Sequence, residues 1–131
     1  MALKFLATIV AMVLVALSVQ ADNATGHFSE EQICQAGIAT NNVRSVKGIR
    51  LLARQGKIIT VAYTRDDGEI FGYACQVEAG EIRWRDQSMT RWNKNIKLYY
   101  SLADGGTRLD IRSVVLGEEV LRQSFTTADF Q

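Results

Sequence analysis

The sequence contains no proline, one histidine and two cysteines. Without proline, every strand interior can donate its backbone N–H to a ladder, so the composition is permissive for a sheet. One histidine and two cysteines cannot complete a four-ligand zinc site unless carboxylates join them, and there is no close Cys-x-x-Cys pair. Zinc binding is therefore the weaker interpretation of the cysteines, and no cofactor or metal is expected.

The patterns of common catalytic sites are also missing. The histidine, His27, stands alone, and no serine lies in a nucleophile-elbow pattern. Residues 104–106 (Asp-Gly-Gly) lack the helix and lysine of a phosphate-binding loop. A carboxylate pair remains as a means of hydrolysis; the candidates are Asp66, Asp67, Glu69 and Glu78. Because Asp-Asp-Gly is typical of a tight hairpin, turn formation explains these residues better, and an enzyme is not favoured.

One long apolar run is present, at the N-terminus. Lys4 precedes an apolar stretch from Phe5 to Val19, and Ala21 ends a small-residue cleavage pattern, as in a secretory signal peptide. A membrane anchor is the alternative, but this stretch is shorter than the ~20 residues of a spanning helix. We therefore predict a cleaved signal peptide at residues 1–21 and a single domain at residues 22–131. The mature protein is expected to be periplasmic or secreted, with no membrane attachment.

The charge balance gives no bulk attraction to polyanions. The predicted signal peptide holds one of the 15 basic residues and none of the 14 acidic ones, so residues 22–131 carry no formal net charge. Basic residues outnumber acidic ones between residues 44 and 97, which allows a basic face, although the interleaved acids favour an ordinary solvated surface. Nucleic acid is therefore not an expected partner.

An even pair of cysteines in an exported chain predicts one disulfide, between Cys34 and Cys75. In the chain-entropy account, closing a loop of about 40 residues stabilises a domain by about 4 kcal/mol. That is comparable with much of the net stability of so small a core.

The clearest local signal is the start of a helix. A capping box and a hydrophobic staple follow each other, formed by Ser29 with Gln32 and by Phe28 with Ile33. Apolar residues, Cys34 among them, then recur at helical spacing until Asn41 and Asn42. The pattern predicts one helix from about residue 30 to 41, after a short mobile lead-in at residues 22–27.

From residue 43 onward, apolar residues alternate and glycine or aspartate separates the runs, which is typical of an antiparallel meander. The expected strands are residues 49–54, 58–64, 69–78, 81–86, 96–102, 107–115 and 119–125. Cys75 belongs to the inward-facing set of its strand, so the disulfide would tie the helix to the buried side of the sheet. We predict an α+β fold in which one N-terminal helix packs on a meander of six to seven strands.

Arginine and tryptophan recur in one region of the surface, a pattern enriched at binding hot spots. The set is Arg83, Trp84, Arg85, Arg91, Trp92, Lys94 and Lys97. If Trp84 points inward, it belongs to the core and leaves Arg83 and Arg85 outside. Trp92, in the irregular segment 87–95, is the better exposed anchor. The candidate partner-binding residues are Arg83, Arg85, Arg91, Trp92 and Lys94.

Three short motifs occur in a particular order: Ile-Cys-x-Ala at residues 33–36, Tyr-x-Cys at residues 73–75 and Arg-Trp at residues 91–92. In this order they resemble a group of small exported proteobacterial proteins of uncharacterised function. The resemblance covers residues 28 to about 92. It implies a periplasmic α+β domain with a helix-to-strand disulfide, and it implies no reaction.

The leading functional hypothesis is an exported, non-enzymatic binding module that engages a protein partner, such as an inhibitor, an immunity-type protein or an accessory subunit. A small-ligand or glycan-binding protein is the alternative, with a cleft lined by tyrosines. The tyrosines considered for that cleft are Tyr63, Tyr73, Tyr99 and Tyr100. A carboxylate-based hydrolase ranks third.

Overall fold

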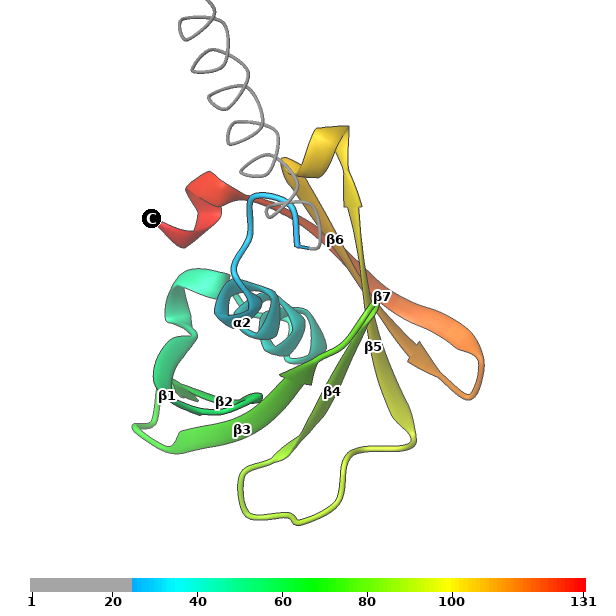
Figure 1. Ribbon diagram of the computed structural model, residues 1–131. Helices are drawn as coiled ribbons and strands as arrows, with labels where there is room; N and C mark the ends of the chain where they lie inside the picture. Colours follow the sequence, from blue (N-terminus) through cyan, green and yellow to red (C-terminus); the bar gives the residue numbers. More distant parts are fainter. Residues whose placement is uncertain (1–24) are drawn as a thin grey trace, which may run out of the picture.

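In the computed structural model, which describes residues 25–131, one α-helix lies inside the curve of an antiparallel sheet (Figure 1). The predicted signal peptide lies outside the described residues. The main elements are α2 (Glu30–Asn41), β1 (Arg50–Gln55), β2 (Ile58–Thr64), β3 (Ile70–Val77), β4 (Glu81–Asp86), β5 (Ile96–Ala103), β6 (Arg108–Val115) and β7 (Glu118–Thr126). Three short 3-10 helices accompany them: η1 (Val46–Gly48), η2 (Asp104–Gly106) and η3 (Thr127–Phe130).

The seven strands form one sheet in sequence order, and each strand is antiparallel to the next. The predicted α+β fold, with one helix on a seven-stranded meander, is therefore confirmed. The strand bounds agree closely with those expected from the alternation of apolar residues. That pattern is informative here because one face of the sheet is buried against the helix and the other meets solvent.

Helix α2 begins and ends where its capping residues place it. The Ser29 hydroxyl accepts from the backbone N–H of Gln32 at 3.1 Å, and the Gln32 side chain accepts from the backbone N–H of Ser29 at 3.0 Å. At the other end, the Asn42 side chain donates to the Ile38 carbonyl at 2.9 Å. The staple residues Phe28 and Ile33 are both buried. The predicted capping box is confirmed.

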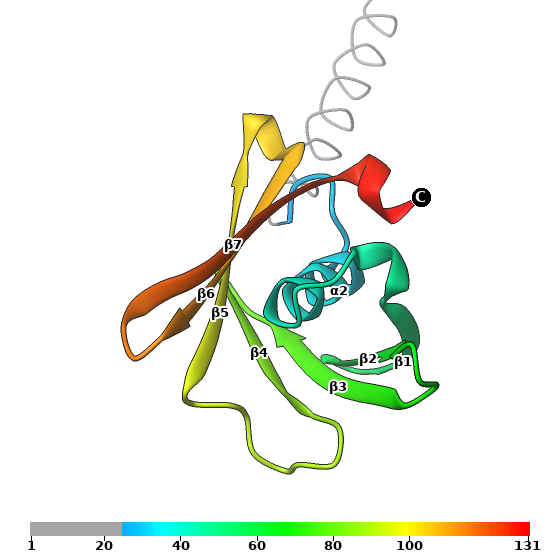
Figure 2. The same cartoon turned by 180° about the vertical axis from the view of Figure 1, so that it is seen from behind.

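The sheet curves around α2 so that the helix touches every strand, as the front and back views show (Figures 1 and 2). Small residues permit this closeness: Ala36, Gly37 and Ala39 are buried on the helix. A Cβ atom at Gly37 would lie only 2.8 Å from Cδ1 of Ile82 on β4. The core therefore forms where these small helix residues let strand side chains approach the helix backbone, and Ile33 and Ile38 of the helix are buried in it as well.

The predicted disulfide joins Cys34 of α2 to Cys75 of β3, and it is confirmed. Both residues are completely buried, and their Cα atoms are 5.9 Å apart. The bond lies inside the hydrophobic core and links α2, the only α-helix of residues 25–131, to the middle of the β2–β3–β4 region. Disulfides of this kind are characteristic of oxidising compartments.

The last part of the lead-in to the helix differs from expectation. Of the segment 22–27, expected to be mobile, residues 22–24 lie outside the described residues, and the backbone N–H of His27 donates to the Gly106 carbonyl at 3.0 Å. Gly26 and Gly106 have positive φ, and a Cβ at Gly26 would lie 2.8 Å from the Gly106 oxygen. Two glycines far apart in the sequence thus allow the two backbones to touch, a contact with no local sequence signal.

Loss of the disulfide should strongly destabilise the fold. We expect the double substitution of Cys34→Ala and Cys75→Ala to lower the free energy of unfolding by about 4 kcal/mol. Without the disulfide, the unfolded chain is no longer constrained by a closed loop. Urea denaturation followed by circular dichroism measures this difference, and the native protein under reducing conditions serves as the matched comparison. A loss below about 1 kcal/mol would show that α2 is held by packing alone.

Candidate functional site

The segment between β4 and β5, residues 87–95, folds back over the end of β4 and is fixed at both ends. At its start, the backbone N–H of Gln87 donates to the Gly72 carbonyl at 2.9 Å. At its end, the backbone N–H of Asn93 donates to the Trp84 carbonyl at 2.8 Å. The Asn93 side chain accepts from the backbone N–H groups of Asn95 and Ile96 at 3.0 and 2.9 Å. This segment is therefore an ordered loop.

The two tryptophans have different environments. Trp84 is only 6 % exposed, and its indole N–H donates to the Ile96 carbonyl at 2.9 Å, so it belongs to the core. Trp92 is half-buried, and the Arg85 guanidinium lies over its ring, 5.3 Å from the centroid. Arg85 also donates to the Met89 carbonyl at 2.5 Å. Arg85 therefore supports the loop and holds Trp92 in place.

These side chains enclose a hollow of about 480 Å³ at the open end of the sheet. Its lining consists of Tyr73, Trp84, Arg85, Asp86, Met89, Arg91, Trp92, Asn93, Lys94 and Asn95. Aromatic rings form part of the wall, and exposed cations lie around it. One carboxylate, Asp86, is also present, and the Ser88 hydroxyl lowers its pKa by donating to it at 2.7 Å.

Aromatic contacts extend from this hollow along the inner face of the sheet. Tyr73 lies 6.2 Å from Tyr63, and Tyr63 lies 5.2 Å from Phe71, with nearly parallel rings in both pairs. The hydroxyls of Tyr63 and Tyr73 both donate to the side-chain oxygen of Asn42, at 3.4 and 3.1 Å. The Arg44 guanidinium covers Tyr63 at 4.2 Å. The residue that caps α2 therefore also positions the tyrosine beside the hollow.

Tyr73 is a weaker acid than an ordinary tyrosine. Burial, together with the proximity of Tyr63 and Asp86, raises the pKa of Tyr73 to about 12. The hydrogen bond to Asn42 acts in the opposite direction and does not offset this effect. At neutral pH, the wall of the hollow thus carries a protonated phenol whose proton is engaged by the helix cap.

The structure brings together four of the five candidate partner-binding residues. Arg85, Arg91, Trp92 and Lys94 all line the hollow. Arg83 does not: it shares the outer face of β4 with Arg85, but it is exposed two residues further from the 87–95 loop, opposite Gln76 of β3. Sequence reasoning missed Tyr73 as a member of this group, since only the β3–β4 register brings Tyr73 next to Asp86 and the loop.

The four tyrosines considered for a ligand cleft do not share one site. Tyr63 and Tyr73 adjoin the hollow described above. Tyr99 lies on the outer face, where the Arg112 guanidinium covers it at 4.8 Å. Tyr100 donates to the Glu78 carbonyl at 2.7 Å, near the β3–β4 turn. Of the four tyrosines, only Tyr63 and Tyr73 therefore lie at the hollow, and Tyr99 and Tyr100 point to opposite faces because they are adjacent on β5.

Three of the four carboxylates considered for hydrolysis, Asp67, Glu69 and Glu78, are engaged in local contacts. Arg65 donates to Asp67 at 3.0 and 2.6 Å and to Glu69 at 2.7 Å, within the β2–β3 turn. The Arg65 hydrogen bonds lower the pKa of Asp67, which opposes a role as proton donor. Glu78 accepts from the Gln76 side chain at 2.5 Å. Turn formation, as expected, accounts for the Asp-Asp-Gly sequence.

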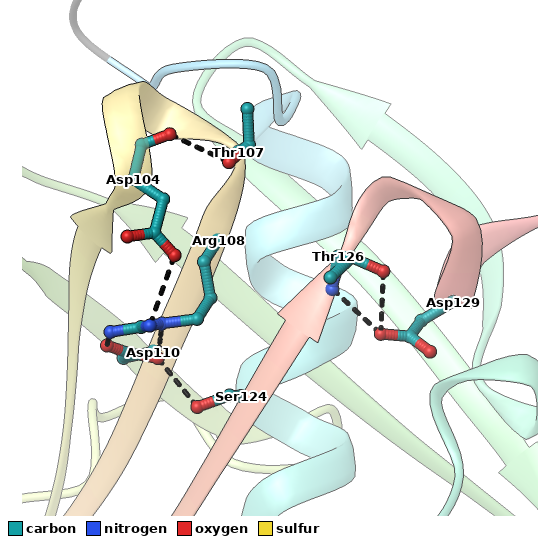
Figure 3. Close-up of polar contacts among 7 residues, drawn as sticks. All are labelled: Asp104, Thr107, Arg108, Asp110, Ser124, Thr126 and Asp129. Carbon is teal, nitrogen blue, oxygen red and sulfur yellow. Dashed lines mark hydrogen bonds and ion pairs between the residues drawn. The ribbon is translucent and has the colours of Figure 1, made fainter.

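A second polar cluster joins η2, β6 and β7 (Figure 3). Arg108 lies between Asp104, at 3.2 Å, and Asp110, at 3.1 Å. The Ser124 hydroxyl donates to Asp110 at 2.6 Å and is the main cause of its lowered pKa. Thr126 and Asp129 form a separate capping box at the start of η3. Asp104, Asp110 and Ser124 are thus joined in one cluster around Arg108, which fastens η2 to β6 and β6 to β7.

Within residues 25–131, no three histidine, cysteine, aspartate or glutamate side chains lie close enough together to hold a metal ion. Over the same range, no helix combines the length and apolar character needed to cross a membrane.

The raised pKa of Tyr73 predicts a loss of stability in alkali. As pH rises above 10, the unfolded chain releases the Tyr73 proton first, while the folded protein keeps it until about pH 12. The contribution of protonated Tyr73 to the free energy of unfolding is therefore complete below pH 10 and disappears as pH rises through 12. Spectrophotometric titration of native protein and Tyr73→Phe should differ by one tyrosine step near pH 12. If the titration step that Tyr73→Phe removes were centred at pH 10 instead, the buried environment of Tyr73 would be contradicted.

In comparisons with known proteins, no family model, no curated protein and no solved structure matches the chain.

Proposed function

We propose that this protein is an exported, non-enzymatic binding module that engages a protein partner through the hollow at residues 73 and 84–95. Inhibitors, immunity-type proteins and accessory subunits all act in this way. The observation that carries the proposal is the convergence of Tyr73, Trp84 and Trp92 with a basic rim in one hollow of about 480 Å³. Tryptophan, tyrosine and arginine are the residue types that dominate binding energy at protein interfaces.

The rim has unsatisfied charge. Arg91 and Lys94 are exposed, and neither forms an ion pair with any residue of the described chain. Met89 beside them is 59 % exposed, and such a flexible apolar side chain adapts to varied surfaces. The fitting partner would insert an apolar or aromatic side chain into the hollow and present acidic groups to Arg91 and Lys94.

The scaffold supports binding because it is already ordered. The loop is fixed at Gln87 and Asn93, Arg85 holds Trp92, and the disulfide fastens the underlying strand β3 to the helix. A pre-ordered site loses less conformational entropy when it binds. The disulfide and the predicted signal peptide together favour action outside the reducing cytoplasm.

A small ligand or glycan is the second candidate. The volume of the hollow lies within the range of small-molecule sites, roughly 300–1,000 Å³, and asparagine side chains at positions 93 and 95 offer hydrogen bonds next to the aromatic rings. A small molecule that raises the melting temperature of the native protein, and not of Trp92→Ala, would favour this candidate over a protein partner.

Removing the anchor and a rim charge should abolish capture of the partner. We expect immobilised protein with Arg91→Ala and Trp92→Ala to lose a partner that the native protein recovers from periplasmic extract. The loss should be at least tenfold, since each hot-spot side chain contributes about 1–2 kcal/mol or more.

A matched control comes from the outer face of the sheet. Tyr99 and Arg112 form a cation–π pair there, so the double substitution of Tyr99→Ala and Arg112→Ala removes one aromatic ring and one guanidinium, as Arg91→Ala with Trp92→Ala does, but away from the hollow. This control should retain every partner. Equal recovery by both double variants would remove the hollow from partner binding.

A further inference from the structure

Strand β7 is an outer edge of the sheet, far along the sheet from the β3–β4 hollow. Over Glu118–Phe125, the backbone forms its hydrogen bonds with β6, and no further backbone bond to this stretch exists within residues 25–131. An edge with free N–H and C=O groups is a template for pairing with another strand. The question is which strand fits it.

The edge has a self-complementary sequence. Glu119, Val120, Leu121 and Arg122 read acid, aliphatic, aliphatic, base, so the order of charges reverses when a second copy is laid antiparallel. In that register, Glu119 stands opposite Arg122 of the second copy, and Val120 stands opposite Leu121. Opposite charges directly across an antiparallel pair are stabilising, and the twofold symmetry makes each contact occur twice.

The bulge in β7 places these residues on matching faces. Ser113 pairs with Leu121 and Val114 pairs with Glu119, which leaves Val120 as the extra residue. Glu119 and Arg122 consequently share the outer face, where they already contact each other at 2.9 Å. Leu121 lies on the inner face with Ser113. Without the bulge, Glu119 and Arg122 would lie on opposite faces and could not pair across a twofold axis.

A hollow of mixed polar and apolar lining beside the edge offers room for the second copy. A space of about 300 Å³ lies between β7 and the segment after α2, and it is lined by Thr40, Val43, Arg44, Ser45, Leu121, Arg122 and Gln123. Val43 is 74 % exposed and has a left-handed backbone (φ 53°), a conformation that is unusual for a β-branched residue. Val120 is 52 % exposed on the edge itself. A second β7 would bring its Val120 towards these exposed groups.

The opposite edge, β1, lacks this property. Antiparallel self-pairing centred on Leu52 would set Arg50 against Arg54 of the second copy, and Arg54 is already paired with Glu30 and Glu31 at 2.7 and 2.5 Å. Like charges facing each other disfavour that arrangement.

We propose that a second copy of this chain docks on β7, forming a symmetric dimer by antiparallel β7–β7 pairing about an axis between Val120 and Leu121. The two sheets become one continuous sheet, and ion pairs between Glu119 and Arg122 replace the contacts within each chain. This surface is separate from the hollow at residues 73 and 84–95, so it stands independently of the proposed function.

Charge reversal provides the test. Sedimentation velocity of the purified oxidised protein should show a concentration-dependent dimer. Glu119→Arg alone and Arg122→Glu alone should each weaken dimerisation by about tenfold or more, because each variant sets like charges against each other twice. An equimolar mixture of the two variants should restore a dimer, since every cross-strand pair is then opposite in charge.

Two controls keep the result specific. Lys57→Glu reverses an exposed charge in the β1–β2 turn and should dimerise like the native protein. Near-ultraviolet circular dichroism should be unchanged in all variants, because Glu119 and Arg122 are surface residues. A native protein that stays monomeric at every concentration, single variants that dimerise normally, or a mixture that stays monomeric would each overturn the proposal.

Discussion

Helix α2 lies so close to the sheet that Gly37 has no room for a side chain. A Cβ atom there would stand 2.8 Å from Ile82 and 3.5 Å from Leu98, on two neighbouring strands. This proximity lets a short helix fill the curve of all seven strands, and it brings Cys34 within bonding distance of Cys75. Close packing of this type is sensitive to a single added methyl group. The close packing of α2 on the sheet is therefore the constraint on which the rest of the fold depends.

The candidate site depends on that packing of α2. Asn42 ends the helix and at the same time accepts the hydroxyls of Tyr63 and Tyr73. Tyr73 in turn forms part of the wall of the hollow beneath Trp92. The helix cap, the buried disulfide and the loop contacts thus act on one region, so the aromatic side chains hold their positions before any ligand arrives. The β7 edge lies elsewhere, because β7 and β1 are the two opposite edges of the sheet.

Much of the fold could be predicted because its signals are local or periodic. The capping box of Ser29 and Gln32 marks the start of the helix, and alternation marks each strand, since one face of the sheet is buried. The disulfide followed from the cysteine count and the predicted export. The remaining features depend on contacts between distant segments. Nothing near Gly26 in the sequence indicates that it touches Gly106, and nothing near Tyr73 indicates that it shares a hollow with Trp92. The inward direction of Trp84, which alternation left open, was decided by its hydrogen bond to Ile96.

The close contact between α2 and the sheet can be measured directly in solution. In a nuclear Overhauser spectrum of the oxidised protein, the α-protons of Gly37 should show strong cross-peaks to the δ-methyl groups of Ile82 and Leu98, because the helix backbone touches both side chains. Absence of these cross-peaks, with both methyl groups assigned, would mean that the helix stands away from the sheet and would contradict the account.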